Sequence, residues 1–318
     1  MPSFPKPSFN YALNVAKELK ALKVYNARPD IKIPASNPSN LVLATWNIAN
    51  LGGQAREPGH LRIIADILSR FDLIGVQEIK DNSADFQAIV KLLGARYKFI
   101  FSDASGNNER MAFVYNSRKI KVLQEVAELT IPPSDFRFVT LPGFTAQFSG
   151  FDRSPYLVSF AAKQFTFSLL NVHLYFGKEN MSSSIERRCL EAYCVARWAD
   201  LRSNSNYAYC SNILAIGDFN LPMVDEKDPV YKALVKRGLQ LPEHTTKVYS
   251  NISNDKTYDQ IAFLPGMKSR IITHGVFPFD NVLFEDLYKS RSAADFKSYV
   301  RYFISDHRPM WMELNLEG

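Results

Sequence analysis

The stretch Asn212-Ile213-Leu214-Ala215-Ile216-Gly217-Asp218-Phe219-Asn220 is an apolar run of strand length that ends in polar side chains. Such runs are typical of buried strands, and the loops that follow strands converge over a rigid sheet. We therefore expect Asp218 and Asn220 to line a cleft at the end of a strand.

A second polar cluster lies near the C-terminus, where Ser305, Asp306 and His307 precede Arg308 and Pro309. A carboxylate beside an imidazole, together with the Asp and Asn of the first stretch, supplies the groups needed to hydrolyse a phosphate ester. The sequence therefore predicts an enzyme.

Strand and helix patterns alternate through most of the chain. Apolar runs of strand length occur at 41–48, 72–79, 97–102, 111–116 and 166–176, and helical patterns at 61–69, 84–93 and 185–201. In the last helical pattern the spacing predicts that Leu190, Cys194, Trp198 and Leu201 face the interior. Polar residues recur at strand ends: Asn47, Glu78, Glu109, Arg110, His173, Asp259, and Asp306 with His307. Apart from Arg110, all of them carry oxygen or imidazole groups.

Each of these residues also has an ordinary structural interpretation. Asp218 and Asn220 fit a Gly-Asp turn in which a side chain satisfies its own backbone. His173 fits a hydrogen-bonded core histidine, and Asp259 fits an acceptor of backbone N–H groups. It is the ordered set along one chain that indicates a catalytic site.

Composition and charge describe an ordinary globular chain with a basic balance. The 318 residues are 46% hydrophobic, enough to bury one large core or two small ones. The formal net charge of +6 favours polyanionic partners, with weaker attraction at high salt. The three cysteines form neither a CxxC nor a zinc spacing, which argues against a disulfide scaffold and favours a reducing compartment.

The first 40 residues differ in pattern from the rest. Residues 10–24 have helical spacing, with Ser8 or Asn10 as a possible N-cap, and 28–40 is a Pro-, Asn- and Ser-rich stretch. We expect an N-terminal helix and extended arm over 1–40 and a catalytic domain over 41–318. The N-terminus has neither a signal-peptide pattern nor a membrane span, so we expect a cytoplasmic protein that does not bind membranes.

Eight motifs carry a resemblance to a known family: WNI (46–48), IGVQEIKD (74–81), ERMAFVYN (109–116), FDRSPY (151–156), NVHL (171–174), GDFN (217–220), TYDQIAF (257–263) and ISDHRP (304–309). With these motifs the chain resembles the endonuclease/exonuclease/phosphatase superfamily, and within it the deoxyribonuclease I branch. The resemblance implies an α/β (α+β) fold, a four-layer α/β/β/α sandwich of two mixed β-sheets with the active site at one end.

The resemblance also implies roles for individual residues. Glu78, with Asn47 and Asp306, matches the divalent-metal position, and oxygen ligands suit Mg²⁺ or Mn²⁺. Asp259 matches the partner of His307, and Glu109 the partner of His173. Asn220 and His307 would hold phosphate oxygens, Asp218 would orient or deprotonate water, and Arg153, Lys80 and Arg110 would contact substrate phosphates. One scheme makes Asp218 the base and another uses the two His–carboxylate pairs; the sequence leaves both open.

Three positions depart from the deoxyribonuclease I pattern. Asn107 stands where an exposed tyrosine would stack in the minor groove, and Ala49 where a basic residue would lie. Lys80 replaces an arginine, which keeps the charge but loses the planar fork. The hydrolytic residues are all present, whereas the groove-reading residues are not.

The resulting expectation is a divalent-metal-dependent DNA endonuclease of low sequence specificity that leaves 5′-phosphate and 3′-hydroxyl ends, with no obligate protein partner. An abasic-site repair endonuclease is an alternative, with 226–236 and 266–279 as candidate wedge loops. A phosphatase or phosphodiesterase acting on inositol phosphates or phospholipid head groups is another, disfavoured because GDFN runs into Leu221-Pro222. A non-catalytic binding module remains as a fourth interpretation, which the complete catalytic set disfavours.

Overall fold

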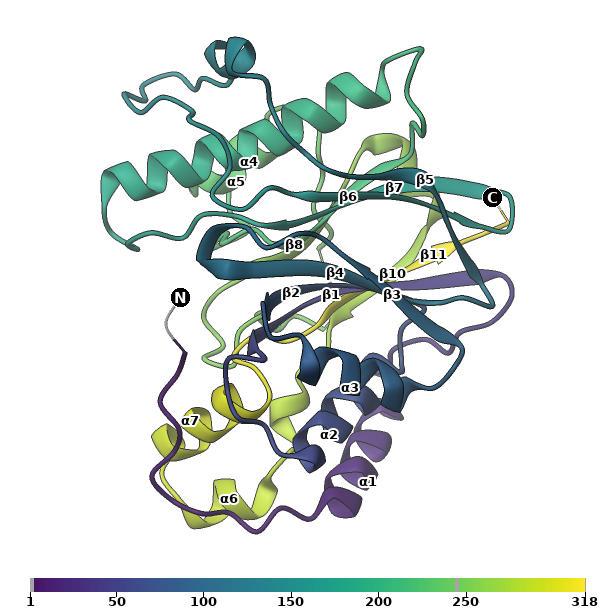
Figure 1. The fold of residues 1–318 in the computed structure, drawn as a ribbon, viewed down its shortest axis with the longest axis vertical. Coiled ribbons are helices and arrows are strands. Elements are labelled where there is room, and N and C mark those ends of the chain that lie inside the picture. Colours follow the sequence, from purple (N-terminus) through teal and green to yellow (C-terminus); the bar gives the residue numbers. More distant parts are fainter. Residues whose placement is uncertain (1–2, 244–245, 318) are drawn as a thin grey trace.

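Two β-sheets pack face to face in the computed structural model, and helices cover their outer faces (Figure 1). The structure describes residues 3–243 and 246–317. One apolar cluster lies between the sheets, a second between the first sheet and its helices, and a third between the second sheet and its helices. These layers confirm the four-layer α/β/β/α sandwich predicted from the sequence.

The first sheet has the strand order β10-β11-β1-β2-β4-β3. Its strands are β1 (Asn40–Leu51), β2 (Leu73–Lys80), β3 (Tyr97–Phe101), β4 (Glu109–Asn116), β10 (Ile271–Val276) and β11 (Met310–Asn315). All of β1 is buried, because it lies between β2 and β11 and has a layer on each face. The pairing of β1 with β2 is parallel, so both strands end at the same edge of the sheet.

The second sheet has the order β5-β6-β7-β8-β9. Its strands are β5 (Ile120–Glu128), β6 (Tyr156–Ala162), β7 (Phe165–His173), β8 (Ile213–Asp218) and β9 (Asp259–Phe263). The parallel pair β7–β8 sets His173 opposite Asp218, and the antiparallel pair β8–β9 sets Asp218 opposite Asp259. The register of this sheet therefore brings three predicted site residues into one row.

Helices form the two outer layers. The first sheet carries α1 (Val15–Asn26), α2 (Pro58–Leu68), α3 (Ala84–Leu93), α6 (Glu285–Ser290) and α7 (Ala293–Phe303), and the second carries α4 (Ser182–Ser203) and α5 (Pro229–Val235). Short 3₁₀ turns lie at Gly106–Asn108, Pro133–Phe138, Pro265–Arg270 and Phe279–Asn281. No helix among the described residues combines the length and the apolarity needed to cross a bilayer.

Two helix predictions were wrong in detail. The N-cap of α1 is Asn14, whose side chain accepts the N–H of Lys17 at 3.1 Å, rather than Ser8 or Asn10. In α4, Leu190 and Cys194 are buried as predicted, but Trp198 is only half-buried and Leu201 is 47% exposed. The buried face of α4 runs instead through its small residues, which let the helix lie close to the sheet: Cys189, Ala192, Val195, Ala196 and Ala199.

Part of each candidate wedge loop is regular structure. Residues 229–235 form α5, because Pro229 suits the first helical turn and Asp228 caps it by accepting the N–H groups of Val230 and Tyr231. Residues 271–276 form β10, which pairs with β11 at the edge of the first sheet. Much of each candidate segment is therefore helix or strand, with Ile272 of β10 56% exposed, and the abasic-site enzyme stays an alternative.

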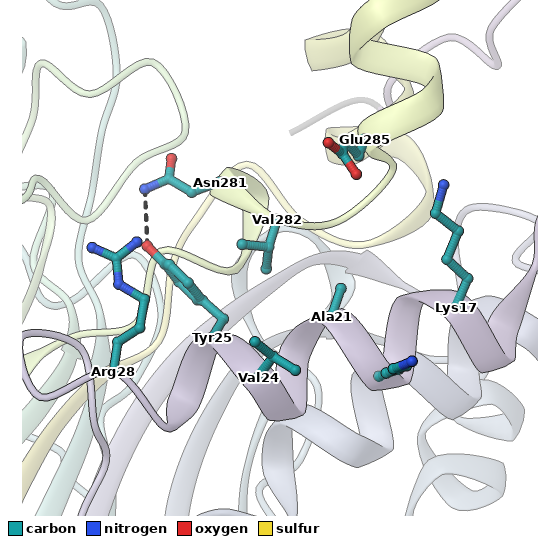
Figure 2. A pocket seen from close by; sticks show the side chains of 9 residues that line it. Lys17, Ala21, Val24, Tyr25, Arg28, Asn281, Val282 and Glu285 are labelled. Atoms are coloured by element: carbon teal, nitrogen blue, oxygen red, sulfur yellow. Dashed lines mark hydrogen bonds between the residues drawn. The ribbon is translucent and has the colours of Figure 1, made fainter.

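The N-terminal segment packs against the helical layer of the first sheet. Buried Glu18 of α1 accepts the N–H of Phe284 at 2.7 Å, and Asn281 donates to the Tyr25 hydroxyl at 3.1 Å. Figure 2 shows the contact of Tyr25 with Asn281. Residues of α1 and of the 281–285 segment line a hollow of about 510 Å³ beside it. Residues Ile31 and Ile33 of the predicted linker are buried. None of the predicted site residues lines this hollow.

Candidate active site

The predicted catalytic residues come together where strands of both sheets end. His173 ends β7, Asp218 ends β8, and Asp259 and Glu109 begin β9 and β4. His307 lies in the turn between α7 and β11. The side chains of all five are buried, so their protonation depends on the charges and hydrogen bonds around them.

His307 and Asp259 form the first histidine–carboxylate pair. Nδ1 of His307 lies 2.8 Å from Oδ2 of Asp259. The backbone of His307 is held as well: its carbonyl accepts the indole N–H of Trp46 at 2.8 Å, and its N–H donates to the Ser305 hydroxyl at 3.0 Å. Burial alone would lower the pKa of His307, but the charges of Asp259 and Asp218 outweigh it and raise that pKa well above the usual value. His307 is therefore suited to carry a positive charge near a phosphate.

His173 and Glu109 form the second pair. Nδ1 of His173 lies 3.3 Å from Oε2 of Glu109, and Lys80 donates to Oε1 of Glu109 at 2.8 Å. Burial would raise the pKa of Glu109, but its bond to His173 and the nearby charges of Arg153 and Lys80 outweigh burial and hold the pKa below its usual range. An ionised Glu109 fixes the orientation of the imidazole ring.

Asp218 lies between the two imidazole rings. Its Oδ2 atom is 3.6 Å from Nε2 of His173 and 3.9 Å from Nε2 of His307. Its other oxygen accepts the N–H of Asn220 at 2.8 Å. Burial opposes ionisation, but the two histidines and the hydrogen bonds outweigh it and lower the pKa of Asp218. The site thus has an ionised carboxylate at its centre with a histidine–carboxylate pair on either side.

Glu78 and Asn47 lie beside Asp218, and Asp306, the third predicted metal ligand, lies close enough for the negative charge of Glu78 to affect it. The amide of Asn47 donates to Glu78 at 2.9 Å and to Asp218 at 3.0 Å, which brings two buried carboxylates within reach of one nitrogen. Burial raises the pKa of Asp306, and the negative charge of Glu78 adds to this. Glu78 has a left-handed backbone with φ of 61°, an uncommon conformation that marks functional sites in many folds.

This donor set fits a hard divalent cation. Carboxylate and amide oxygens are the ligands that Mg²⁺ and Mn²⁺ prefer, and Oδ1 of Asn47 is buried with no hydrogen-bond partner in the described structure. A second group, formed by Asp218, Asp259 and His307, has ligand atoms within 4.8 Å of one another. In that group Nδ1 of His307 already contacts Asp259, so this nitrogen is not available to bind a metal.

The three predicted phosphate contacts all have carboxylate partners. Arg153 is 3% exposed and donates to the carbonyls of His173 and Leu174 at 2.9 and 3.0 Å. The guanidinium therefore holds the backbone at the end of β7, and its role as a phosphate clamp stays a prediction. Lys80 pairs with Glu109, and Arg110 pairs with Asp81 at 2.8 Å while keeping an exposed edge.

Asn220 is held by the loop after the neighbouring strand. Its Nδ2 donates to the Leu174 carbonyl at 2.7 Å, and its own carbonyl accepts from Arg188 at 3.3 Å. Arg188 also donates to the carbonyls of Tyr175 and Phe176. This buried arginine of α4 therefore ties together the loops that follow β7 and β8 and fixes Asn220.

Several supporting residues were not predicted as site residues from the sequence. Arg188 looks like any other charge on a helical pattern, and only its burial reveals its role. A second case is the polar link between the sheets, where Gln77 of β2 donates to Asn171 of β7 at 2.6 Å. Both residues sit in the recognised motifs, so their position beside Glu78 and His173 was the available signal.

Solved structures of the same fold resemble this chain. A search of curated proteins found no match. Among solved structures, an endonuclease/exonuclease/phosphatase family protein from Bacteroides thetaiotaomicron is 21% identical, with a TM-score of 0.55 over 88% of this chain and 97% of that one. A mannosyl-6-phosphatase from the same species is 19% identical, with a TM-score of 0.54 over 86% and 99%. Danio rerio TDP2 complexed with a single-strand DNA product is 15% identical, with a TM-score of 0.56 over 87% and 99%.

The similarity to these structures establishes the fold, and the amino-acid sequence also matches a family model. The model of the endonuclease/exonuclease/phosphatase family matches residues 44–307, a span that includes every predicted site residue. Members of this family hydrolyse phosphate esters and are generally dependent on divalent metals. The chain belongs to the endonuclease/exonuclease/phosphatase family and is a phosphoester hydrolase.

Proposed function

We propose that this chain is a divalent-metal-dependent phosphodiesterase that cuts DNA with low sequence specificity and leaves 5′-phosphate and 3′-hydroxyl ends. The observation that carries the proposal is the position of Asp218 between two histidine–carboxylate pairs. Hydrolysis of a diester needs one group to accept the proton of water and another to protonate the leaving oxygen. The site offers both.

In the proposed reaction Asp218 orients a water molecule and accepts its proton as the water oxygen attacks phosphorus. The bond from phosphorus to the 3′ oxygen breaks, and His173, paired with Glu109, donates the proton that converts this oxygen to a 3′-hydroxyl. His307, kept positive by its carboxylate neighbours, and the amide of Asn220 stabilise the charge on the non-bridging oxygens. Asp259 and Glu109 hold the two rings in orientation.

Glu78, Asn47 and Asp306 are the proposed ligands of the metal, which we take to be Mg²⁺ or Mn²⁺. A bound divalent ion would neutralise negative charge on the phosphate oxygens. We prefer this group to that of Asp218, Asp259 and His307, because it consists of oxygen donors alone and leaves the His307–Asp259 pair free for proton chemistry.

DNA is the proposed substrate on grounds of charge. The formal net charge of +6 attracts a polyanion, and phosphate contacts position a duplex without reading its sequence. Lys80 and Arg110 keep exposed surface near the site, and we propose them as the phosphate contacts. The likeness to TDP2 concerns the fold, and it puts DNA first among the substrates to test.

One observation favours a second candidate, a phosphatase acting on a small phosphomonoester. Lys80 and Arg153 both turn toward Glu109, at 2.8 and 3.9 Å, so these two cations already pair with a carboxylate of the site. A monoester needs fewer contacts to neighbouring phosphates than a polymer does. A sugar phosphate or inositol phosphate is the form that this candidate would take.

The test compares substrates under one metal condition. Supercoiled plasmid, a duplex with one abasic site, a single-stranded oligonucleotide, an inositol phosphate and p-nitrophenyl phosphate are each incubated with the protein and Mg²⁺. The proposal expects nicking of undamaged plasmid, with nicks that DNA ligase reseals because the ends are 5′-phosphate and 3′-hydroxyl. Turnover of the monoesters without nicking would replace it with the phosphatase, and turnover of none of the five with the binding module.

A further inference from the structure

The peptide group between Ala49 and Asn50 points at the proposed metal ligand. The N–H of Asn50 donates to Oε2 of Glu78 at 2.8 Å, and both residues have left-handed backbones, with φ of 48° and 61°. Because a peptide group is planar and trans, the orientation of the Ala49 carbonyl fixes the direction of the Asn50 N–H. A side chain that holds the Ala49 carbonyl therefore also sets the direction of the hydrogen bond from Asn50 to Glu78.

Arg56 holds the Ala49 carbonyl from one side. Its guanidinium is buried, and it donates to the carbonyls of Ala49 and Asn50 at the end of β1 and to those of Phe303 and Ile304 before the Ser305–His307 turn. Two of these acceptors lie in the segment of Asn50, which donates to Glu78, and the other two lie in the segment that leads to His307. Arg56 thus joins two parts of the active site through backbone contacts alone.

Gln54 holds the same carbonyl and is itself held by the N-terminal segment. Its Nε2 donates to the carbonyls of Ala49 at 3.4 Å and Tyr302 at 2.7 Å, while its Oε1 accepts the backbone N–H of Phe4 at 3.1 Å. Next to it, the Ser3 hydroxyl donates to the Gly53 carbonyl at 3.2 Å. Residues outside the family match therefore contact Gln54 and Gly53, which follow β1.

Aromatic contacts fasten this N-terminal segment along its length. Arg301 of α7 lies over the ring of Phe4, with its guanidinium carbon 5.1 Å from the ring centroid. Phe9 and Tyr11 pack against Tyr299 of the same helix, with ring centroids 6.2 and 5.3 Å away. In Figure 1 the purple segment passes beside α6 and α7 before it enters α1. The segment is thus fixed to the helix that leads into the Ser305–His307 turn.

We propose that Gln54 and Arg56, secured from outside by the N-terminal segment at Phe4, are positioning residues that aim the Asn50 N–H at Glu78 and so preorganise the metal site. This inference rests on the proposed role of Glu78 as a metal ligand. Left-handed backbones at non-glycine residues are strained and persist only where surrounding contacts over-determine them. Gln54 and Arg56 supply those contacts for Asn50.

Mn²⁺ affinity tests the inference without relying on activity. Free Mn²⁺ is measured by electron paramagnetic resonance in titrations of the full chain and of Gln54→Leu, Phe4→Pro, Phe4→Ala and Glu78→Gln. Phe4→Pro removes both the N–H and the ring, whereas Phe4→Ala keeps the N–H, so their difference isolates the hydrogen bond to Gln54. Lys6→Ala, at an exposed position of the same segment, is the matched control.

The inference predicts that Gln54→Leu and Phe4→Pro weaken Mn²⁺ binding about tenfold, the lower end of what supporting residues around metals contribute. Phe4→Ala should weaken it less than Phe4→Pro, and Lys6→Ala should leave it unchanged. Excess Mn²⁺ should restore kcat in Gln54→Leu, which a general loss of folding would not allow. Arg56→Lys is expected to show the largest loss, but unfolding of that variant would not affect the other comparisons.

Two outcomes separate this inference from the proposed function. Wild-type Mn²⁺ affinity in Glu78→Gln would overturn the metal assignment and the inference with it. Loss of binding in Glu78→Gln together with wild-type affinity in both Gln54→Leu and Phe4→Pro would overturn the inference alone.

Discussion

Nδ1 of His307 lies 2.8 Å from Oδ2 of Asp259, and both side chains are buried at the end of the second sheet. This contact fixes which ring nitrogen faces the centre of the site, because the nitrogen bonded to the carboxylate carries its proton there. Nε2 is left pointing toward Asp218, 3.9 Å away.

Asp259→Asn should therefore lower kcat by about 10- to 100-fold, the range seen when the partner of a functional histidine is lost. An amide lacks the negative charge that keeps His307 positive, and its N–H has no acceptor at Nδ1 while the ring is protonated. Steady-state kinetics with Asp286→Asn, an exposed carboxylate on α6, as the control would check this. Equal kcat values in the two variants would show that Asp259 does not orient His307.

Asp218→Asn should lower kcat by about 10²- to 10⁴-fold, because the amide cannot accept a proton from water. The fold should persist, since the amide oxygen can still accept the Asn220 N–H. Circular dichroism and thermal unfolding establish that the variant is folded, and kinetics give the loss. A folded variant with wild-type kcat would remove Asp218 from the proposed chemistry.

Removal of metal should stop turnover, and Mg²⁺ or Mn²⁺ should restore it. Binding to the folded state alone adds about 2.7 kcal/mol at a metal concentration 100-fold above the dissociation constant. The melting temperature of the wild-type protein should therefore rise with Mn²⁺, whereas that of Glu78→Gln should not. An unchanged rate in chelator, or an equal rise in both proteins, would contradict the oxygen-ligand site.

His60 predicts a pH dependence of stability that is separate from catalysis. It is buried, bonded to the Tyr299 hydroxyl at 2.8 Å and stacked on Phe303 at 4.2 Å, and burial with the charge of Arg56 lowers its pKa to about 4. In the unfolded chain His60 binds a proton as the pH falls through about 6.5, whereas in the folded chain it stays neutral down to about pH 4. The free energy of unfolding is therefore highest above pH 6.5 and falls as the pH drops toward 4.

His60→Phe keeps the aromatic stack and removes this titration. Relative to wild type, the variant should gain about 2 kcal/mol in free energy of unfolding between pH 7 and pH 5, from 1.5 pH units at about 1.4 kcal/mol each. Urea unfolding at the two pH values measures the gain. Parallel changes in the two proteins would mean that His60 is protonated in the folded state.

Residues at strand ends could be predicted from the sequence, and the reason is local. An apolar run such as 212–217 has to be buried, and the side chain that follows it has to lie at the sheet edge, so Asp218 was identifiable without coordinates. The family resemblance then supplied the pairing of His307 with Asp259, which the structure shows as a direct contact.

The hydrogen-bond partners of several residues could not be predicted, because they depend on packing between segments that are far apart in the chain. Arg153 lies within a recognised motif (151–156), yet its side chain points inward to the carbonyls of His173 and Leu174. Gln54 and Arg56 lie in a stretch with no chemical pattern, and their contacts span about 250 positions of the chain, to the 302–304 segment. Leu201 fits a helical spacing, but it is exposed on the last turn of α4.

Nicking of supercoiled plasmid by the purified protein in Mg²⁺, with Asp218→Asn alongside, tests the central claim most directly. The account predicts conversion to the open circular form by the wild-type protein, abolished by chelator and reduced at least about 100-fold in the variant. Intact plasmid after incubation with folded, Mg²⁺-supplied wild-type protein, or equal nicking by Asp218→Asn, would contradict it.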